Sequence, residues 1–236
     1  MRIASTMLKT FNIVGAVCAL AFAVQASAAG VDSLSNKDAA SGIKEALSKG
    51  AEIAVGQLGK TNGFLGDNRV KIDLPESART VEQMMRTLGM GKQADELITT
   101  MNRAAEMAVV EAKPILLNAV KSMSVDDARG ILTGGNDAAT QYFKRTTSTA
   151  ISAKFLPIVK KSTAKVKLAD QYNNYAGKAS KFGVLDPKDA DLDSYVTKKA
   201  MDGLFLMIAE QEKSIRQDPV GTGSSMLQKV FGAVGR

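Results

Sequence analysis

Residues 195–216 read YVTKKAMDGLFLMIAEQEKSIR, and this stretch indicates the fold class. Its apolar residues recur every three or four positions, which is the spacing of one face of an α-helix. The apolar face comprises Tyr195, Val196, Ala200, Leu204, Phe205, Ile208 and Ala209, and the exposed end is marked by Glu210, Glu212, Lys213 and Arg216. A helix with so broad an apolar face has to pack against other elements of a helical domain.

The same helical spacing extends towards the N-terminus. Residues 35–38 offer a cap for a first helix, which Gly59 ends. The apolar side of this helix comprises Ile43, Leu47, Ala51, Val55 and Leu58. Pro75 begins a further helix that runs to about Leu88. Between the two helices, apolar and charged residues alternate, a pattern compatible with a small two-stranded β ribbon near residues 70–74.

Proline residues and caps divide the middle of the chain. Pro114 is expected to kink or split one long helix, and Ser124 to cap the short helix that follows. Another helix begins near residue 137, after two glycines. Residues 155–177 are expected to form a separate basic helix, interrupted near its start by Pro157.

The predicted organisation is a leader followed by one helical domain. Residues 1–29 combine a basic start, an apolar run and small residues around a cleavage site near Ala28 or Ala29, as in a secretory signal peptide. Residues 30–236 are expected to form one all-α, bundle-like domain of about seven or eight helices. Residues 218–225 are expected to be a flexible connector to a C-terminal amphipathic helix, which docks on the domain or contacts a membrane surface. We therefore expect an exported, periplasmic protein.

Composition excludes several kinds of site. The chain has no histidine, and its one cysteine, Cys18, lies in the leader. Imidazole zinc sites, Ser-His-Asp triads, Cys-His dyads and disulfides within the mature chain are therefore excluded. Loss of the leader lowers the 31 basic residues to 29, against 24 acidic ones, for a net charge of +5. Export and the lack of a recognised binding module argue against nucleic acid as a partner, and no cofactor is expected.

Residues 126–143 read DDARGILTGGNDAATQYF, and this segment resembles an uncharacterised bacterial family, domain of unknown function 4197. Four shorter stretches also resemble the family's pattern: IDLP at 72–75, NRAAE at 102–106, AMDGLF at 200–205 and EKSIR at 212–216. The similarity covers nearly all of the chain after the leader. It implies an exported, largely helical protein, and it supplies no activity, ligand or catalytic residue.

Two groups of polar residues are candidates for ligand binding. The candidates are Arg103, Glu106, Asp126, Asp127, Arg129 and Tyr142. The first two lie three positions apart on a predicted helix, where an arginine beside a carboxylate could bind a polar ligand or activate water. The alternative is an ordinary helix pair that orders a polar layer.

No pattern specifies a metal or a catalytic residue. Residues 189–193 begin like a calcium loop, but Ser194 stands where the loop needs glycine. Acidic residues that complement a helix dipole explain the same segment. Ser-x-x-Lys matches occur at 41–44 and 162–165, without the other motifs of penicillin-binding enzymes.

We expect a non-catalytic binding or interaction module of the cell envelope, with an envelope protein or a small ligand as its partner. One alternative is a carboxylate-dependent hydrolase of envelope glycans or esters, in which Glu106 and Asp127 would have to meet in a cleft. Another is a carrier of apolar molecules with a methionine-rich cavity. The methionines of that cavity would be Met84, Met85, Met101 and Met107.

Overall fold

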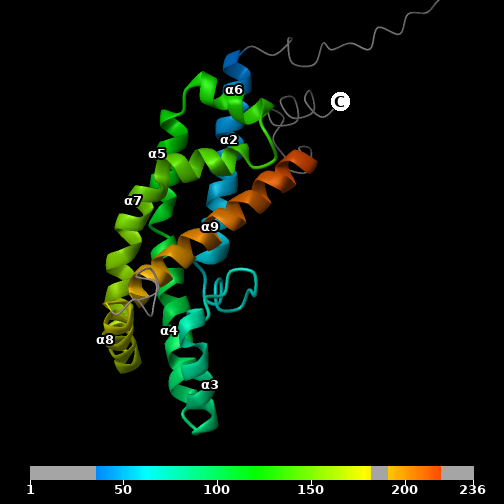
Figure 1. Ribbon diagram of the computed structural model, residues 1–236. Helices are drawn as coiled ribbons and strands as arrows, with labels where there is room; N and C mark the ends of the chain where they lie inside the picture. The colour runs from blue at the N-terminus through cyan, green and yellow to red at the C-terminus, as the bar shows by residue number, and fades with distance from the viewer. Residues whose placement is uncertain (1–35, 182–190, 219–236) are drawn as a thin grey trace, which may run out of the picture.

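The computed structural model describes residues 36–181 and 191–218 (Figure 1). The elements are α2 (Asn36–Leu58), the 3₁₀ helix η1 (Glu76–Ala78), α3 (Arg79–Thr87), α4 (Gly91–Val109), α5 (Ala112–Ser122), α6 (Val125–Thr133), α7 (Ala138–Thr163), α8 (Lys167–Lys181) and α9 (Leu192–Gln217). These two ranges contain no β-strand, so the prediction of an all-α fold is confirmed. The predicted leader, Asp189 and the predicted C-terminal helix lie outside the described residues.

The two longest helices, α7 and α9, pack along one another and organise the other elements. Helix α4 packs against both of them, and α2 packs against α9, α5 and α6. The α3–α4 hairpin lies at the lower end of the molecule in Figure 1, where α3 packs mainly against α4 and η1. The buried apolar side chains of all these helices form one continuous cluster.

The predicted apolar faces lie in this core. All five apolar residues predicted on the first helix are buried, and so are Val196, Ala200, Leu204, Phe205 and Ile208 of α9. The capping prediction at Ser124 is also confirmed. Its hydroxyl accepts a hydrogen bond from the N–H of Asp127 at 3.0 Å, and the Asp127 carboxylate accepts from the N–H of Ser124 at 3.1 Å. This reciprocal capping box starts α6.

The two interior prolines have different effects. Near Pro114 the helix splits as expected, since α4 ends at Val109 and α5 begins at Ala112. At Pro157 the prediction of a separate helix over residues 155–177 is wrong, because α7 passes through this proline without a break. The side chains of Ile151, Phe155 and Val159 on the same helix are fully buried. Their burial outweighs the one backbone hydrogen bond that an exposed proline removes.

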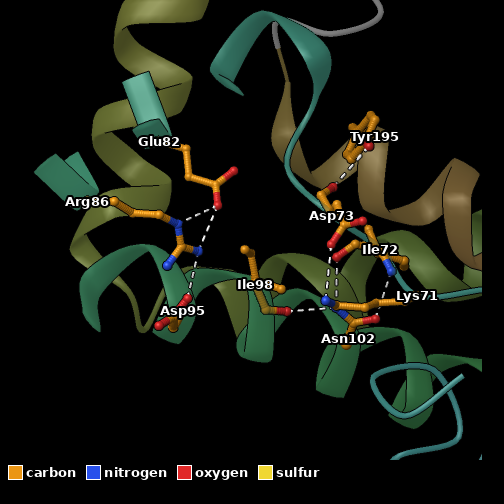
Figure 2. A network of polar contacts seen from close by, with 9 residues as sticks. All are labelled: Lys71, Ile72, Asp73, Glu82, Arg86, Asp95, Ile98, Asn102 and Tyr195. Atoms are coloured by element: carbon orange, nitrogen blue, oxygen red, sulfur yellow. Dashed lines mark hydrogen bonds and ion pairs between the residues drawn. The ribbon is translucent and has the colours of Figure 1, made fainter. Parts of the chain in front are cut away.

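The predicted ribbon near residues 70–74 does not form within the described residues. The segment has no regular secondary structure, and a side chain takes the place of a partner strand. The N–H of Ile72 donates to Asn102 Oδ1 at 2.9 Å, and Asn102 Nδ2 donates to the carbonyl of Ile72 at 2.8 Å (Figure 2). Asn102 Nδ2 also donates to the carbonyl of Ile98 at 2.8 Å. A side chain of helix α4 therefore satisfies both backbone groups of Ile72 that a second strand would have paired.

Candidate functional site

Arg103 and Glu106 form a clamp between α4 and the loop after α2. Glu106 is buried, and its Oε1 accepts hydrogen bonds from the N–H groups of Phe64 at 3.1 Å and Leu65 at 3.3 Å. Its Oε2 pairs with Arg103 Nη1 at 2.5 Å, and Arg103 Nη2 donates to Asn62 Oδ1 at 2.8 Å. Both carboxylate oxygens are thus engaged in holding the loop. This geometry favours the polar layer over a ligand site.

The second predicted group is divided between capping and surface positions. Asp127 belongs to the capping box, and the hydrogen bonds from Ser124 lower the pKa of its carboxyl. Tyr142 is buried, its hydroxyl donates to the carbonyl of Ala119 at 2.9 Å, and its burial raises the pKa of the phenol. Asp126 and Arg129 are exposed on α6. Asp127 and Tyr142 thus stabilise the fold and lie close enough for the charge of Asp127 to contribute to the raised pKa of Tyr142, whereas Asp126 and Arg129 lie on the surface.

The two alternative sites named above gain no support from the geometry. Glu106 holds the loop after α2 and Asp127 caps α6, and the two carboxylates share no hydrogen-bond or ion-pair partner among the described residues. The methionines also differ in how far they are exposed to solvent. Met101 is fully buried, whereas Met84 and Met107 are 60% and 53% exposed. The predicted cavity between these methionines is therefore wrong, because two of them face solvent.

A groove of about 440 Å³ opens between α7 and α9. Its α7 wall consists of side chains at every fourth position, namely Lys144, Ser148, Ser152 and Leu156, and residues 194–205 of α9 form the facing wall. The two serines are small, so the helices leave space between them at this level. Sequence reasoning missed this site, although the four-residue spacing was a signal that these side chains share one helix face.

The comparisons with known proteins identify the family. A family model described as "Protein of unknown function (DUF4197)" matches residues 33–232. The chain belongs to this family. No curated protein and no solved structure matches it.

The stretches by which this DUF4197 chain resembles its family contain the clamps just described. NRAAE at 102–106 supplies Asn102, Arg103 and Glu106, and residues 126–143 supply Asp127 and Tyr142. Each of these five side chains joins segments or caps a helix. In these two stretches, the five side chains therefore serve the fold.

The stretch EKSIR at 212–216 supplies a further clamp that sequence reasoning missed. Glu212 was expected at an exposed end of its helix, and that prediction is wrong, because the residue is buried. Its carboxylate accepts hydrogen bonds from the N–H groups of Ala139 and Thr140 at 3.0 and 2.9 Å, and it pairs with Arg216 at 2.9 Å. Asp137 precedes α7 without capping it through its side chain, so Glu212 supplies the cap from α9. Only the spacing of Glu212 and Arg216, four positions apart, hinted at a pair.

The tip of the α3–α4 hairpin in this DUF4197 chain has an unusual polarity. Arg86 Nη2 pairs with Glu82 on the same helix and with Asp95 on α4, each at 2.7 Å (Figure 2). The apolar side chains of Met84, Leu88 and Met90 are exposed. Part of the polar side of α3 therefore contacts α4, while apolar side chains face solvent.

The acidic side chains at the start of α9 make hydrogen bonds within α9 and to α7. Asp191 accepts a hydrogen bond from the N–H of Asp193 at 3.1 Å, and the Asp193 carboxylate accepts from the hydroxyl of Thr163. In the described ranges, no group of three or more acidic side chains is placed to hold a metal ion. No helix in the described part of the chain is long and apolar enough to cross a membrane.

Proposed function

We propose that this protein is an exported, non-catalytic module of the cell envelope that binds a partner protein through the tip of its α3–α4 hairpin. The tip surface comprises Met84, Leu88 and Met90. The observation that carries the proposal is the solvent exposure of these large apolar side chains, which reaches 70% for Leu88. Neighbouring exposed apolar side chains on a soluble protein are typical of interaction sites.

The chemistry of the tip suits a protein partner. Two of its three side chains are methionines, which are flexible and polarizable and adapt to an irregular apolar surface. The ion pair of Arg86 with Asp95 links α3 to α4, and the pair with Glu82 orients the Arg86 side chain, so the apolar residues are presented on a supported helix and turn. Gly89, which has a φ of 75°, makes the turn between the two helices. Binding would bury apolar surface that the monomer leaves in water.

Two further features support the other parts of the proposal. The leader supports export, because its basic start, apolar run and small residues fit a secretory signal peptide. The non-catalytic role is supported by the engagement of Glu106, Asp127 and Glu212 in hydrogen bonds that hold or cap helices. These hydrogen bonds give each of the three carboxylates a role in the fold.

The test is capture of a partner from the envelope by the mature protein carrying a photoreactive residue at Gln83, which lies on α3 and is exposed. We expect one cross-linked partner, and we expect Met84→Ser with Leu88→Ser to abolish its capture. The matched control is Leu206→Ser, which alters an exposed apolar residue on α9 and should leave capture unchanged. Equal capture by all variants, or a cross-link only to a second copy of the chain, would overturn the proposal. Turnover of an envelope glycan or ester that is lost in Glu106→Gln would contradict the non-catalytic role.

A further inference from the structure

The α7–α9 groove contains a buried hydroxyl that the protein does not satisfy. Thr197 lines the groove and is 4% exposed, and its Oγ1 is the only buried side-chain nitrogen or oxygen in the described ranges without a hydrogen-bond partner. The buried hydroxyls of Thr147, Ser162 and Thr163 donate to carbonyls one turn earlier in their helix, and that of Thr140 donates to the carboxylate of Glu212. A buried polar group without a partner is costly and needs an explanation. A ligand in the groove that reaches this hydroxyl would supply the missing acceptor.

The charges around the groove favour one negative charge. Lys198 is paired with Asp202 at 3.2 Å, so these two residues neutralise each other. Lys144 is in no ion pair with any described residue, and its ammonium lies 5.8 Å from the centre of the Phe205 ring. The lining therefore carries a net charge of +1, from two lysines and one aspartate. A monoanion complements this charge, whereas a phosphate monoester brings nearly two negative charges at neutral pH.

The remaining lining is apolar or weakly polar. Leu156, Met201 and Phe205 present carbon and sulfur to the groove, and Ser148 and Ser152 create its width. The volume of about 440 Å³ lies within the range of small-molecule sites. The ligand thus needs an apolar body beside its charged group.

We propose that the α7–α9 groove binds a monocarboxylate with an apolar body, of the size of a medium-chain fatty acid. The carboxylate pairs with the ammonium of Lys144 and accepts a hydrogen bond from the hydroxyl of Thr197. The chain lies against Leu156, Met201 and Phe205. This site uses none of the residues of the α3–α4 tip, and the inference is independent of the proposed function.

The test is calorimetric titration of the mature protein with octanoate, combined with mapping of amide shifts by NMR. We expect binding with shifts concentrated in residues 144–156 and 194–205. Thr197→Val removes the hydroxyl and keeps the shape, and Lys144→Met removes the charge and keeps the length. Each should weaken octanoate binding about tenfold, as expected for the loss of a bond to a charged group. Lys154→Met, an exposed lysine of α7 outside the groove, is the matched control and should bind as the native protein does.

Three related ligands separate the contributions of charge and chain. Octanol lacks the charge, acetate lacks the chain, and octyl phosphate carries the larger charge, so all three should bind more weakly than octanoate. Unfolding of Thr197→Val should need at least as much urea as unfolding of the native protein, since no hydrogen bond of the protein is lost. Absence of octanoate binding at millimolar concentration, shifts outside the groove, or equal affinity in Thr197→Val would overturn the site. Tighter binding of octyl phosphate or octanol would overturn the assignment to a monocarboxylate.

Discussion

Glu212 and Thr140 lie 72 residues apart in the sequence, yet one oxygen of the Glu212 carboxylate accepts both the N–H and the hydroxyl of Thr140, each at 2.9 Å. The other oxygen accepts from the N–H of Ala139 and pairs with Arg216. Arg216 in turn donates to the carbonyl of Ile131 in the last turn of α6 at 2.8 Å. One carboxylate on α9 therefore fixes the position of α7 directly and that of α6 through Arg216.

We predict that Glu212→Ala lowers the free energy of unfolding by about 3–5 kcal/mol, because it leaves the half-buried Arg216 and two backbone N–H groups without their acceptor. Urea denaturation followed by circular dichroism measures this change. The control is Glu210→Ala on the same helix, which removes a more exposed ion pair to Arg69 and should cost much less stability. Equal losses in the two variants would show that the Glu212 cap has no special role.

Replacement of Asn102 should release the segment it pairs with. Asn102→Ala leaves the N–H and the carbonyl of Ile72 unpaired in a buried position, and we expect a loss of about 2–4 kcal/mol in the free energy of unfolding. Hydrogen exchange should show faster exchange of the Ile72 amide in the folded variant. The control, Asn68→Ala, changes an exposed asparagine of the same loop region and should alter neither quantity. Retained protection of the Ile72 amide would contradict the proposed pairing.

Two helical glycines should respond in opposite directions to the same substitution. A Cβ at Gly203 of α9 would lie 2.8 Å from the buried ring of Phe64 and 3.3 Å from Val70, so Gly203→Ala should destabilise the protein by about 1–3 kcal/mol. A Cβ at Gly130 of α6 meets nothing within 4 Å. Gly130→Ala should therefore stabilise the protein by about 0.5–1 kcal/mol through helix propensity. Thermal and urea denaturation of both variants measure the two changes in the free energy of unfolding. Stabilisation by Gly203→Ala would contradict the close approach of α9 to Phe64.

The capping box at Ser124 should contribute to stability in a pH-dependent way. The pKa of Asp127 is lowered from its ordinary value of 3.8 by hydrogen bonds from Ser124, so folding favours the ionised carboxylate. The contribution of the ionised Asp127 carboxylate to stability is therefore complete above the ordinary pKa of 3.8, and it is lost as the pH falls through the lowered pKa. Asp127→Asn should cost about 0.5–1 kcal/mol at about pH 6, and this cost should shrink as the pH is lowered below 3.8. Urea denaturation at about pH 6 and at a series of acidic pH values tests this, and a cost independent of pH would exclude an ionic cap.

Local patterns in the sequence predicted the elements that depend on local interactions. The apolar spacing from Ile43 to Leu58 and from Val196 to Ile208 predicted which faces are buried, because a helix brings residues three and four apart onto one side. The cap at Ser124 was predictable, since both partners lie within four residues of each other. The helix break expected at Pro157 failed, because the burial of Phe155 and Val159 depends on packing between helices.

The candidate site was less accessible to sequence reasoning. Arg103 and Glu106 were correctly placed next to each other on a helix, but their role depends on the loop at Asn62 to Leu65, which lies 41 residues away or more. The groove requires α7 and α9 to lie side by side, and nothing in either helix alone specifies that neighbour.

The sequence by itself determined the all-α class, the buried helix faces, the capping box and the absence of histidine chemistry, because each depends on composition or on residues close together in the chain. Only the tertiary structure decided that Glu212 caps α7, that Asn102 replaces a strand partner and that Thr197 retains a buried hydroxyl without an acceptor. The physical reason is that a polar side chain is satisfied by whichever group the packed helices bring within about 3 Å, and that neighbour is fixed by the burial of apolar faces far apart in the sequence.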